Sequence, residues 1–457
     1  MTAGVDDKTG RPDPELVQQL RARVAERLRD RRRAEQAAGG ALGPEDEREL
    51  ARDLIGQELG RYSEEQLLAA RAPLELPAED ALAEAVHDAL FRLGRLQPLL
   101  DDEQIENIDV NGPDEVWLEY ADGTVVAAPP IADSNEELVE LMRSIGAYAG
   151  HAARRFDAGY PMLDLKLPDG HRLAAIMEVS TRPAMSIRRH RFQRVFLAHA
   201  HEDNLLDMGV VDYGLAEFLA ACVRARKNIV ISGETGAGKT TMLRALANAM
   251  HPAERLITIE NALELGLHEH KDLHRNVIAL EARQANVEGE GEIAMATLVQ
   301  RTLRHNPYRV IVGEVLGDEV VSMLEAMSQG NAGSLCTIHS SSPAFTFRRM
   351  AMYAAKSAMR LEPWVTYQMI DGAIDFVVFI HQHVDRSTDG ARRRVRHVAS
   401  VLEVLEADGR MVATNEVFQP GPDGRAVPYT PPRCLGDLEL EGYDPSLFHN
   451  PNGWWAP

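Results

Sequence analysis

Eight consecutive residues, Gly233-Glu234-Thr235-Gly236-Ala237-Gly238-Lys239-Thr240, follow the phosphate-binding pattern G-x-x-x-x-G-K-[ST]. Glycines in such a loop let successive backbone N–H groups turn towards a phosphate, and Lys239 is placed to reach the β- and γ-phosphates. The Thr240 hydroxyl would hold Mg²⁺, and Thr241 begins a helix whose N-terminus adds positive partial charge. We therefore expect residues 233–241 to bind a nucleoside triphosphate with Mg²⁺.

The residues on either side of this loop supply the structural context that it requires. Residues 227–232 are typical of a buried strand and residues 241–250 of a helix. Between residues 201 and 375 apolar strands alternate with helices, and the strands at 228–232, 256–260 and 310–313 are candidates for one parallel sheet. We predict an α/β fold with a RecA-like nucleotide-binding core over 201–375.

Three further residues in this core could take part in phosphate chemistry. Glu314 ends the apolar run Val310–Gly313, where an ATPase places the carboxylate that orients the attacking water. Glu260 ends another apolar run and could support Mg²⁺ together with Thr240 and Glu314. His339 ends a short strand after a glycine-rich turn and could contact the γ-phosphate. Each residue taken alone also has a structural explanation: Glu314 and Glu260 could simply end strands, and His339 could be a structural histidine.

The chain before this core divides into a helical part and a small sheet domain. Residues 1–75 are helical in pattern, with a basic stretch at 27–33 that suits an anionic membrane, a partner or, more commonly, solvent. Residues 76–200 predict a small α/β domain with two β-hairpins, one over 116–128 and one over 163–176. Between these hairpins Ser134 and Glu137 form a capping box, which predicts the start of a helix.

The chain after the core is expected to be mostly β and then irregular. Residues 376–420 predict a β-meander, and residues 421–457 are punctuated by proline and glycine. Inside the core, the segment 268–274 contains three histidines but has neither cysteine nor helical i, i+4 spacing. We interpret that segment as a solvent-exposed loop and expect no metal other than Mg²⁺.

Composition limits the functional classes that remain. The 457 residues suffice for about three domains, and the net charge of −21 opposes an extended nucleic-acid surface, so we expect no nucleic-acid partner. The three cysteines lie about a hundred residues apart, which indicates neither a zinc site nor a disulfide framework. No apolar run spans a bilayer and the N-terminus does not look like a signal peptide. A cytoplasmic protein with peripheral membrane contact is expected.

Four ordered motifs together resemble the type II/type IV secretion ATPase superfamily, and specifically its CpaF/TadA-type members of tight-adherence pili. After the phosphate loop, residues 259–265 resemble the aspartate box, 309–314 the Walker B strand and 330–339 the histidine box. The resemblance runs from about residue 99 to 343. It implies a homo-oligomeric ring, a hexamer, that hydrolyses ATP with Mg²⁺ and passes force to inner-membrane platform proteins during pilus assembly or secretion.

The resemblance extends to the sheet domain, where residues 107–112 and 167–172 match the family's pattern. Arg172 and Arg188 stand where family members reach the nucleotide from this domain, which would make them charge-compensating catalytic residues beside Glu314, Glu260 and His339. Surface salt bridges explain each arginine equally well. By resemblance, hydrolysis moves the sheet domain against the core.

Three positions depart from the family's pattern and keep other interpretations open. Asn261 replaces an aspartate, Asn331 replaces a histidine, and Leu316 stands where an arginine is common. The departures allow an ATP-binding scaffold with little turnover, and a nucleic-acid-translocating ATPase of the same core fold is the other alternative. A GTPase or a transporter ATPase is excluded, because the N/T-K-x-D and LSGGQ-like motifs are absent.

Overall fold

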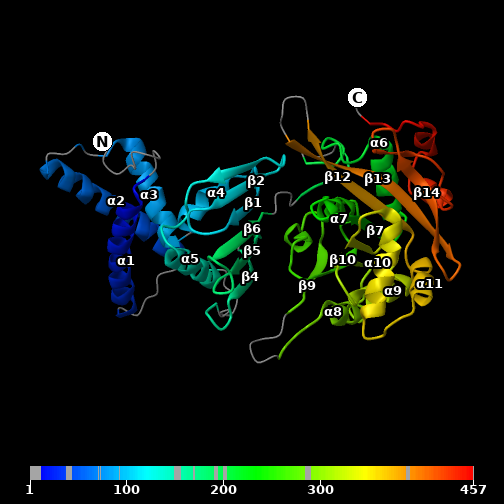
Figure 1. Cartoon of the computed structure of the whole chain (residues 1–457), viewed down its shortest axis with the longest axis horizontal. Helices are drawn as coiled ribbons and strands as arrows, with labels where there is room; N and C mark the ends of the chain where they lie inside the picture. Colours follow the sequence, from blue (N-terminus) through cyan, green and yellow to red (C-terminus); the bar gives the residue numbers. More distant parts are fainter. Residues whose placement is uncertain are drawn as a thin grey trace. The chain divides into compact units, whose positions relative to one another are not determined.

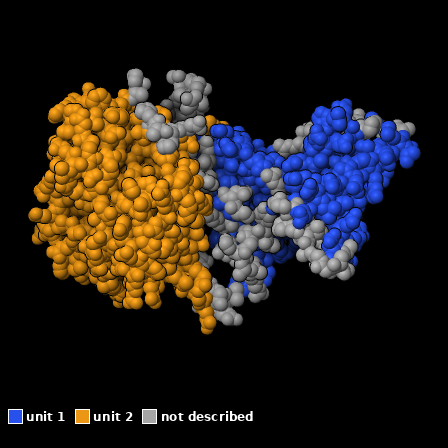
Figure 2. Space-filling model, turned by 180° about the vertical axis from the view of Figure 1, so that it is seen from behind, with its two compact units in different colours: residues 1–121, 125–189 blue, residues 122–124, 190–457 orange. Residues whose placement is uncertain are grey.

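The protein is described from a computed structural model that covers residues 12–37, 44–69, 72, 74–91, 93–148, 156–167, 170–189, 194–198, 203–283, 290–386 and 392–455. The chain forms two compact units, coloured separately in Figure 2. The first comprises residues 1–121 and 125–189, and the second comprises residues 122–124 and 190–457. The sequence also predicts a break between two helical segments at Gly39-Gly40, and these two residues lie outside the described ones.

The first unit begins with three helices that pack on one another. They are α1 (Pro14–Ala37), α2 (Pro44–Leu68) and α3 (Leu76–Phe91). Their shared core includes Val24, Leu59 and Val86, which are all buried. We expected the sheet domain to begin at residue 76, but α3 buries its apolar stripe against α1 and α2. In the basic stretch, Arg27 is bound within this bundle, because its Nη1 lies 2.8 Å from Oε1 of Glu58.

The rest of the first unit is an antiparallel six-stranded sheet in the order β3-β2-β1-β6-β5-β4. Its strands are β1 (Ile105–Val110), β2 (Val116–Tyr120), β3 (Val125–Ala128), β4 (Met162–Lys166), β5 (Arg172–Ile176) and β6 (Ala184–Arg188). Both predicted hairpins, β2–β3 and β4–β5, are present. A short 3-10 helix (Gly94–Leu96) and α4 (Gln97–Asp101) precede the sheet, and α5 (Asn135–Tyr148) follows β3.

Helix α5 begins at the predicted capping box. The backbone N–H of Glu137 lies 3.2 Å from Oγ of Ser134, and Oε2 of Glu137 accepts from the N–H of Asp133 at 2.7 Å. The helix buries Leu138 and Met142 against the sheet. The capping signal in the sequence therefore placed this helix correctly.

The second unit is built on one nine-stranded sheet in the order β15-β14-β13-β12-β7-β11-β10-β8-β9. Its strands are β7 (Ile229–Gly233), β8 (Arg255–Glu260), β9 (Asn276–Glu281), β10 (Arg309–Val315), β11 (Leu335–His339), β12 (Phe376–Arg386), β13 (Arg392–Ala407), β14 (Val412–Pro420) and β15 (Ala426–Pro428). The strands from β12 to β9 are parallel, as predicted for β7, β8 and β10. Figure 1 shows helices on both sides of this sheet.

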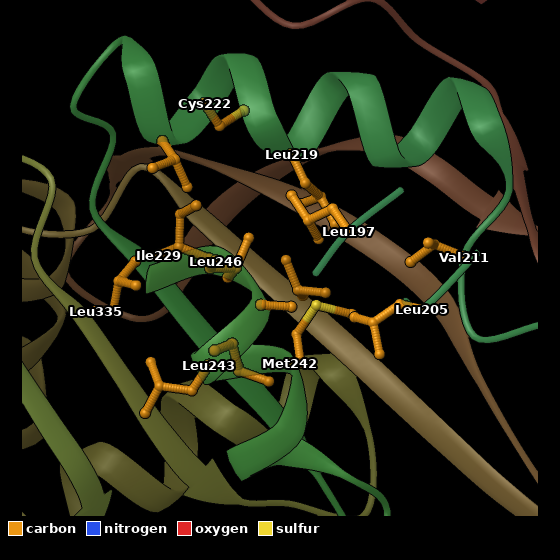
Figure 3. Close-up of a cluster of buried hydrophobic side chains, with 14 of the residues drawn as sticks. Leu197, Leu205, Val211, Leu219, Cys222, Ile229, Met242, Leu243, Leu246 and Leu335 are labelled. Carbon is orange, nitrogen blue, oxygen red and sulfur yellow. The ribbon is translucent and has the colours of Figure 1, made fainter. Parts of the chain in front are cut away.

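Alternating side chains of the central strands bury two separate apolar cores. Ile229 and Ile231 of β7 join one core with α6 (Tyr213–Arg224) and α7 (Lys239–Asn248), whereas Val230 points to the other. Figure 3 shows the first core, where Leu219 of α6, Met242 and Leu246 of α7, and Leu335 of β11 meet. The helices that contribute to the second core are α8 (Met295–Thr302), α9 (Glu319–Ser328), α10 (Pro343–Lys356) and α11 (Pro363–Asp371).

The C-terminal part of the chain continues the core sheet. The predicted β-meander is present as β12, β13 and β14, and β12 lies parallel to β7 at the centre of the sheet. The tail, which we expected to be irregular, contains β15, α12 (Leu435–Leu440) and a 3-10 helix (Pro445–His449). Its end is fixed to the core, since the N–H of Trp454 donates to Oδ2 of Asp212 at 2.6 Å.

Among the described residues, no helix combines the length and the apolar character that crossing a membrane requires.

Candidate nucleotide site

The phosphate loop (residues 233–240) connects β7 to α7 at the carboxyl edge of the parallel sheet. Gly236 has φ +78° and Gly238 has φ +92°, a left-handed region that side chains other than glycine rarely adopt. Gly233 leaves no room for a side chain, since a Cβ atom there would lie 2.5 Å from the carbonyl oxygen of Ile380. Helix α7 begins directly after Gly238, two residues earlier than the sequence predicted. The strand, loop and helix are therefore arranged as phosphate binding requires.

Lys239 is buried and makes three hydrogen bonds within the protein. Its Nζ lies 3.2 Å from the carbonyl oxygen of Gly233, 2.9 Å from that of Glu234 and 3.0 Å from Nδ1 of His339. An ammonium group has three N–H donors and no acceptor, so a phosphate oxygen must compete with these partners for a donor. Phosphate oxygens would take the place of one or more of these partners.

The sheet register brings His339 beside the phosphate loop. His339 is the last residue of β11 and pairs with Gly233 of β7, and its Nδ1 also lies 3.4 Å from Oγ1 of Thr235. On its other side, Nε2 of His339 lies 2.5 Å from Oε1 of Glu314. Because Nδ1 accepts from the Lys239 ammonium, Nε2 carries the ring proton and faces the Glu314 carboxylate. The predicted residues Lys239, His339 and Glu314 thus form one series of close polar contacts.

Glu314 lies within a β-bulge of β10. The pairing of β10 with β11 shifts between Val312 and Val315. Within this irregularity the Thr337 hydroxyl donates to the carbonyl oxygen of Gly313 at 2.7 Å. Bulges next to active sites commonly redirect a side chain, and here the carboxylate meets His339.

The buried carboxylate of Glu260 holds the loop that follows β8. Its Oε2 accepts from the N–H of Glu264 at 2.7 Å and from that of Leu265 at 2.9 Å. Burial raises the pKa of Glu260 to about 7, against the lowering effect of these two hydrogen bonds. Gly313 makes room for this side chain, since a Cβ atom there would lie 2.9 Å from Cγ of Glu260. Glu260 has a clear structural role, and its metal-supporting role stays a prediction.

Two side chains that the sequence analysis did not single out hold the phosphate loop from the neighbouring strands. Nε2 of Gln382 on β12 donates to the carbonyl oxygen of Thr235 at 2.7 Å, and Nε of Arg396 on β13 donates to that of Gly236 at 2.8 Å. Gln382 and Arg396 face each other across the β12–β13 pair. No sequence motif identifies Gln382 and Arg396 as loop contacts. They reach the phosphate loop only through the strand register, which brings together residues about 150 positions apart in the sequence.

The two predicted arginines lie together in the sheet domain. Arg172 of β5 pairs directly with Arg188 of β6, so both side chains stand on the same face of that sheet. Opposed like charges destabilise a strand pair unless anionic groups lie nearby. The roles assigned to Arg172 and Arg188 stay predictions.

The three departures from the family pattern lie in different surroundings. Asn331 precedes β11, whose first residue pairs with the first residue of β7, so Asn331 lies at the opposite edge of the sheet from His339. It is buried and its Nδ2 donates to the carbonyl oxygen of Ala326 at 3.1 Å, which gives it a structural role. Asn261 and Leu316, in contrast, are exposed and follow Glu260 and β10 directly.

The histidine-rich segment 268–274 is less exposed than expected, since only Glu269, Lys271 and Asp272 of its residues are exposed. His274 is buried, with its Nε2 2.8 Å from Oδ1 of Asn248. Burial lowers the pKa of His274 to about 4, and the nearby charge of His270 acts in the same direction. The histidine pattern alone could not distinguish this buried side chain from the half-buried His268 and His270.

The chemistry of the donors fits a magnesium nucleotide. Thr240, half-buried at the N-terminus of α7, offers a hydroxyl oxygen, and Glu314 and Glu260 offer carboxylates, which are the oxygen ligands that Mg²⁺ prefers. A phosphate loop on a RecA-like parallel sheet, followed by a glutamate and a histidine at the ends of the next strands, defines a P-loop nucleotide-binding protein.

Comparison with known proteins agrees with this class. Residues 92–426 match the family model described as type II/IV secretion system protein. A putative conjugal transfer protein of Mycobacterium tuberculosis is 32% identical over 323 residues, covering 70% of this chain and 86% of that protein. The type IV secretion system protein VirB11 of Brucella suis is 29% identical over 361 residues, covering 73% and 95%.

Among solved structures, the VirB11 ATPase of Brucella suis in complex with sulphate matches with 27% identity and a TM-score of 0.35, covering 70% of this chain and 96% of that one. The family model spans most of the chain. The protein therefore belongs to the type II/IV secretion system protein family of ATPases.

Proposed function

We propose that this chain is a Mg²⁺-dependent ATPase motor that powers pilus assembly or protein secretion across the cell envelope. The observation that carries the proposal is the series of close polar contacts from Lys239 through His339 to Glu314 at the phosphate loop. In an ATPase a carboxylate near the γ-phosphate orients the attacking water, and Glu314 is held for this role by His339. Family membership supports the same reaction.

In this proposal each residue of the series has a separate task. Lys239 binds the phosphates, Thr240 and the carboxylates of Glu314 and Glu260 hold Mg²⁺, and that ion neutralises charge on the phosphates. Glu314 orients the water and takes up its proton. When Lys239 turns to a phosphate oxygen, Nδ1 of His339 loses its donor, and His339 can then donate to the γ-phosphate only after Nδ1 takes up a proton from solvent. Loss of that phosphate would return the Lys239 ammonium to His339.

We also propose that the motor works as a ring, a homohexamer, on the cytoplasmic face of the membrane. The proposal rests on the family and on the CpaF/TadA-like motifs of the sequence, with inner-membrane platform proteins as partners and peripheral contact with the bilayer. Arg172 and Arg188 would compensate charge on the nucleotide. Their placement side by side on one sheet face suits a shared anionic partner.

The first experiment measures Mg²⁺-ATP hydrolysis by the purified chain as a function of protein concentration, with Glu314→Gln measured in parallel. Specific activity that rises with concentration and is lost in the variant supports a ring ATPase. ATP binding without turnover at any concentration contradicts the motor and supports an ATP-binding scaffold. The exposed departures Asn261 and Leu316 give that second candidate its physical basis.

The same assay tests the nucleic-acid alternative. Hydrolysis that increases several-fold on adding single- or double-stranded DNA would favour a translocase. With a net charge of −21 we expect no stimulation at physiological salt.

A further inference from the structure

Three histidines lie together on the face of the β12–β13 pair that is opposite to Gln382 and Arg396. His381 and His383 alternate with Gln382 along β12, so both point to the same face, and His397 of β13 pairs directly with His381. The ring centroids are 6.0 Å apart for His381 and His383, 5.7 Å for His381 and His397, and 5.6 Å for His383 and His397. Each ring is therefore a direct neighbour of the other two.

His397 is buried in a single tautomer. Its Nε2 lies 3.1 Å from the carbonyl oxygen of Gly424, and because a carbonyl only accepts, Nε2 carries the proton. Nδ1 then has a free lone pair, and it is buried without a hydrogen-bond partner. The side chain thus presents an unprotonated nitrogen beside two further imidazoles.

This arrangement has the features of a histidine metal ligand. Metal-binding histidines commonly donate their second ring N–H to a backbone carbonyl, as His397 does to Gly424. Three imidazoles that bind one ion through bonds of about 2.0–2.1 Å place their ring centroids about 5–6 Å apart. The observed separations fall in this range, and an unpaired buried lone pair is costly unless a cation or donor satisfies it.

We propose that His381, His383 and His397 bind one divalent transition-metal ion, of which Zn²⁺ is the expected example. Imidazole nitrogen suits Zn²⁺, Cu²⁺ and Ni²⁺, whereas Mg²⁺ and Ca²⁺ require oxygen. Three protein ligands leave one position of a tetrahedral ion to water. The site is separate from the nucleotide site, since it lies on the other face of the strand pair.

Closing the site requires rotation of the two exposed rings. Among the described residues, Glu84, His87 and Asp88 of α3 bring their ligand atoms within 4.8 Å of one another, whereas the three histidines do not. His381 and His383 are exposed, and the χ2 torsion of histidine is broad, so both rings can turn towards His397. His397 is fixed by its bond to Gly424 and sets the position of the ion.

Zinc binding to the full chain, without an affinity tag and after treatment with a chelator, tests the proposal. Competition against a chromophoric chelator gives stoichiometry and affinity, and Co²⁺ gives the visible absorption of a four-coordinate site. We expect the chain to bind one Zn²⁺. His383→Asn should lower the affinity for Zn²⁺ at least about 10-fold. His305→Asn, which changes another exposed histidine, should leave the affinity unchanged. Unchanged zinc affinity in His383→Asn would overturn the proposal.

Two further variants separate this site from other possible zinc ligands and from loss of folding. His87→Asn removes the histidine of the α3 group, and we expect it to retain the ion. Zinc should raise the melting temperature of the wild-type chain and of His87→Asn, but not that of His383→Asn, while Mg²⁺ has no such effect. If the ion is lost with His87 and kept without His383, the proposed site is wrong.

Discussion

Nε2 of His339 lies 2.5 Å from Oε1 of Glu314, while Nδ1 of the same ring accepts from Lys239. The residue that we propose to bind phosphate and the residue that we propose to orient water are therefore connected through one imidazole. A ring in this position transmits the presence of a phosphate to the carboxylate, because Lys239 cannot donate the same N–H to both His339 and a phosphate oxygen.

His339→Ala should lower the rate of hydrolysis without weakening ATP binding. Loss of the donor to Glu314 removes the positioning of the general base, which typically contributes about 10²-fold or more. Lys239 loses a competing acceptor, so the Kd for ATP should be unchanged or lower. Single-turnover hydrolysis and equilibrium binding separate the two effects, and His339→Gln, which keeps an N–H donor, should retain more activity. A variant that hydrolyses normally would contradict the assigned role.

Lys239→Ala should remove most nucleotide binding. The ammonium is buried next to two loop carbonyls, and a hydrogen bond to a charged group contributes about 1.5–3 kcal/mol, which corresponds to at least about 10-fold in Kd. Lys227→Ala is the matched control, because Lys227 pairs with Asp437 at 2.8 Å and lies at the other end of β7. Fluorescent-nucleotide titration measures both variants. Equal binding by Lys239→Ala and the parent would show that the phosphate-loop assignment is wrong.

Arg396→Gln should weaken ATP binding by about 10-fold, because the carbonyl oxygen of Gly236 loses a charged donor that holds the loop in shape. Gln382→Ala should have a smaller effect, since a neutral amide hydrogen bond contributes less. Isothermal titration with a non-hydrolysable ATP analogue gives the Kd values. Arg410→Gln, at an exposed position, is the control. If Arg396→Gln lowers the turnover rate at saturating ATP but leaves the Kd unchanged, the loop-holding role is refuted.

Glu254→Gln should destabilise the core by about 3 kcal/mol, because it leaves the buried guanidinium of Arg309 without its carboxylate. Nε and Nη2 of Arg309 lie 2.7 Å and 2.9 Å from the two oxygens of Glu254. Denaturant unfolding measures the loss. Asp272→Asn, which breaks the exposed pair with Arg194, should change stability by less than about 1 kcal/mol. Equal losses in both variants would argue against a special contribution of the buried pair.

The Glu254 carboxylate also makes the free energy of unfolding depend on pH in the acidic range. Burial raises the pKa of Glu254, but the hydrogen bond and charge of Arg309 outweigh burial, so the pKa lies below its ordinary value. A depressed pKa means that this contribution is complete above the ordinary pKa and is lost as the pH falls through the folded-state value. In Glu254→Gln this part of the acid sensitivity should be missing.

His274 should make the core less stable between pH 6.5 and pH 4. Its pKa falls from 6.5 to about 4 on folding, so the unfolded chain takes up a proton first as the pH drops. A shift of this size corresponds to about 3 kcal/mol over that interval. His274→Gln should flatten the pH dependence of the melting temperature there, with the exposed His305→Asn unchanged from the parent. A slope that stays the same in His274→Gln would rule out this residue as the source.

Local patterns in the sequence predicted the parts of the fold that depend on near neighbours. The strand, loop and helix around Lys239, the capping box at Ser134 and the two hairpins of the sheet domain follow from alternation, capping and turn signals within about ten residues. The order of the motifs brought Lys239, Glu314 and His339 into one hypothesis. The structure places these three within hydrogen-bonding distance in series.

The features that the sequence did not predict depend on register and packing between distant segments. The bulge that contains Glu314 involves one shifted pairing between β10 and β11, which leaves no compositional trace. Gln382 and Arg396 reach the phosphate loop only because β12 lies next to β7. Tertiary neighbours also decide whether the apolar stripe of α3 packs on helices or on a sheet. They decide as well which histidine of the segment 268–274 is buried.

The long strand β13 connects the C-terminal region of the chain to the phosphate loop. Arg396 and Glu403 lie on this one strand, and the Glu403 carboxylate accepts from the N–H of Arg433 at 2.8 Å and 3.0 Å and from Nδ2 of Asn415 at 2.9 Å. The tail is also fastened to α6 through Trp454 and Asp212. Shortening the protein after Pro420 would leave buried acceptors without donors in the same sheet that holds the phosphate loop. A minimal catalytic fragment therefore has to extend to about residue 455.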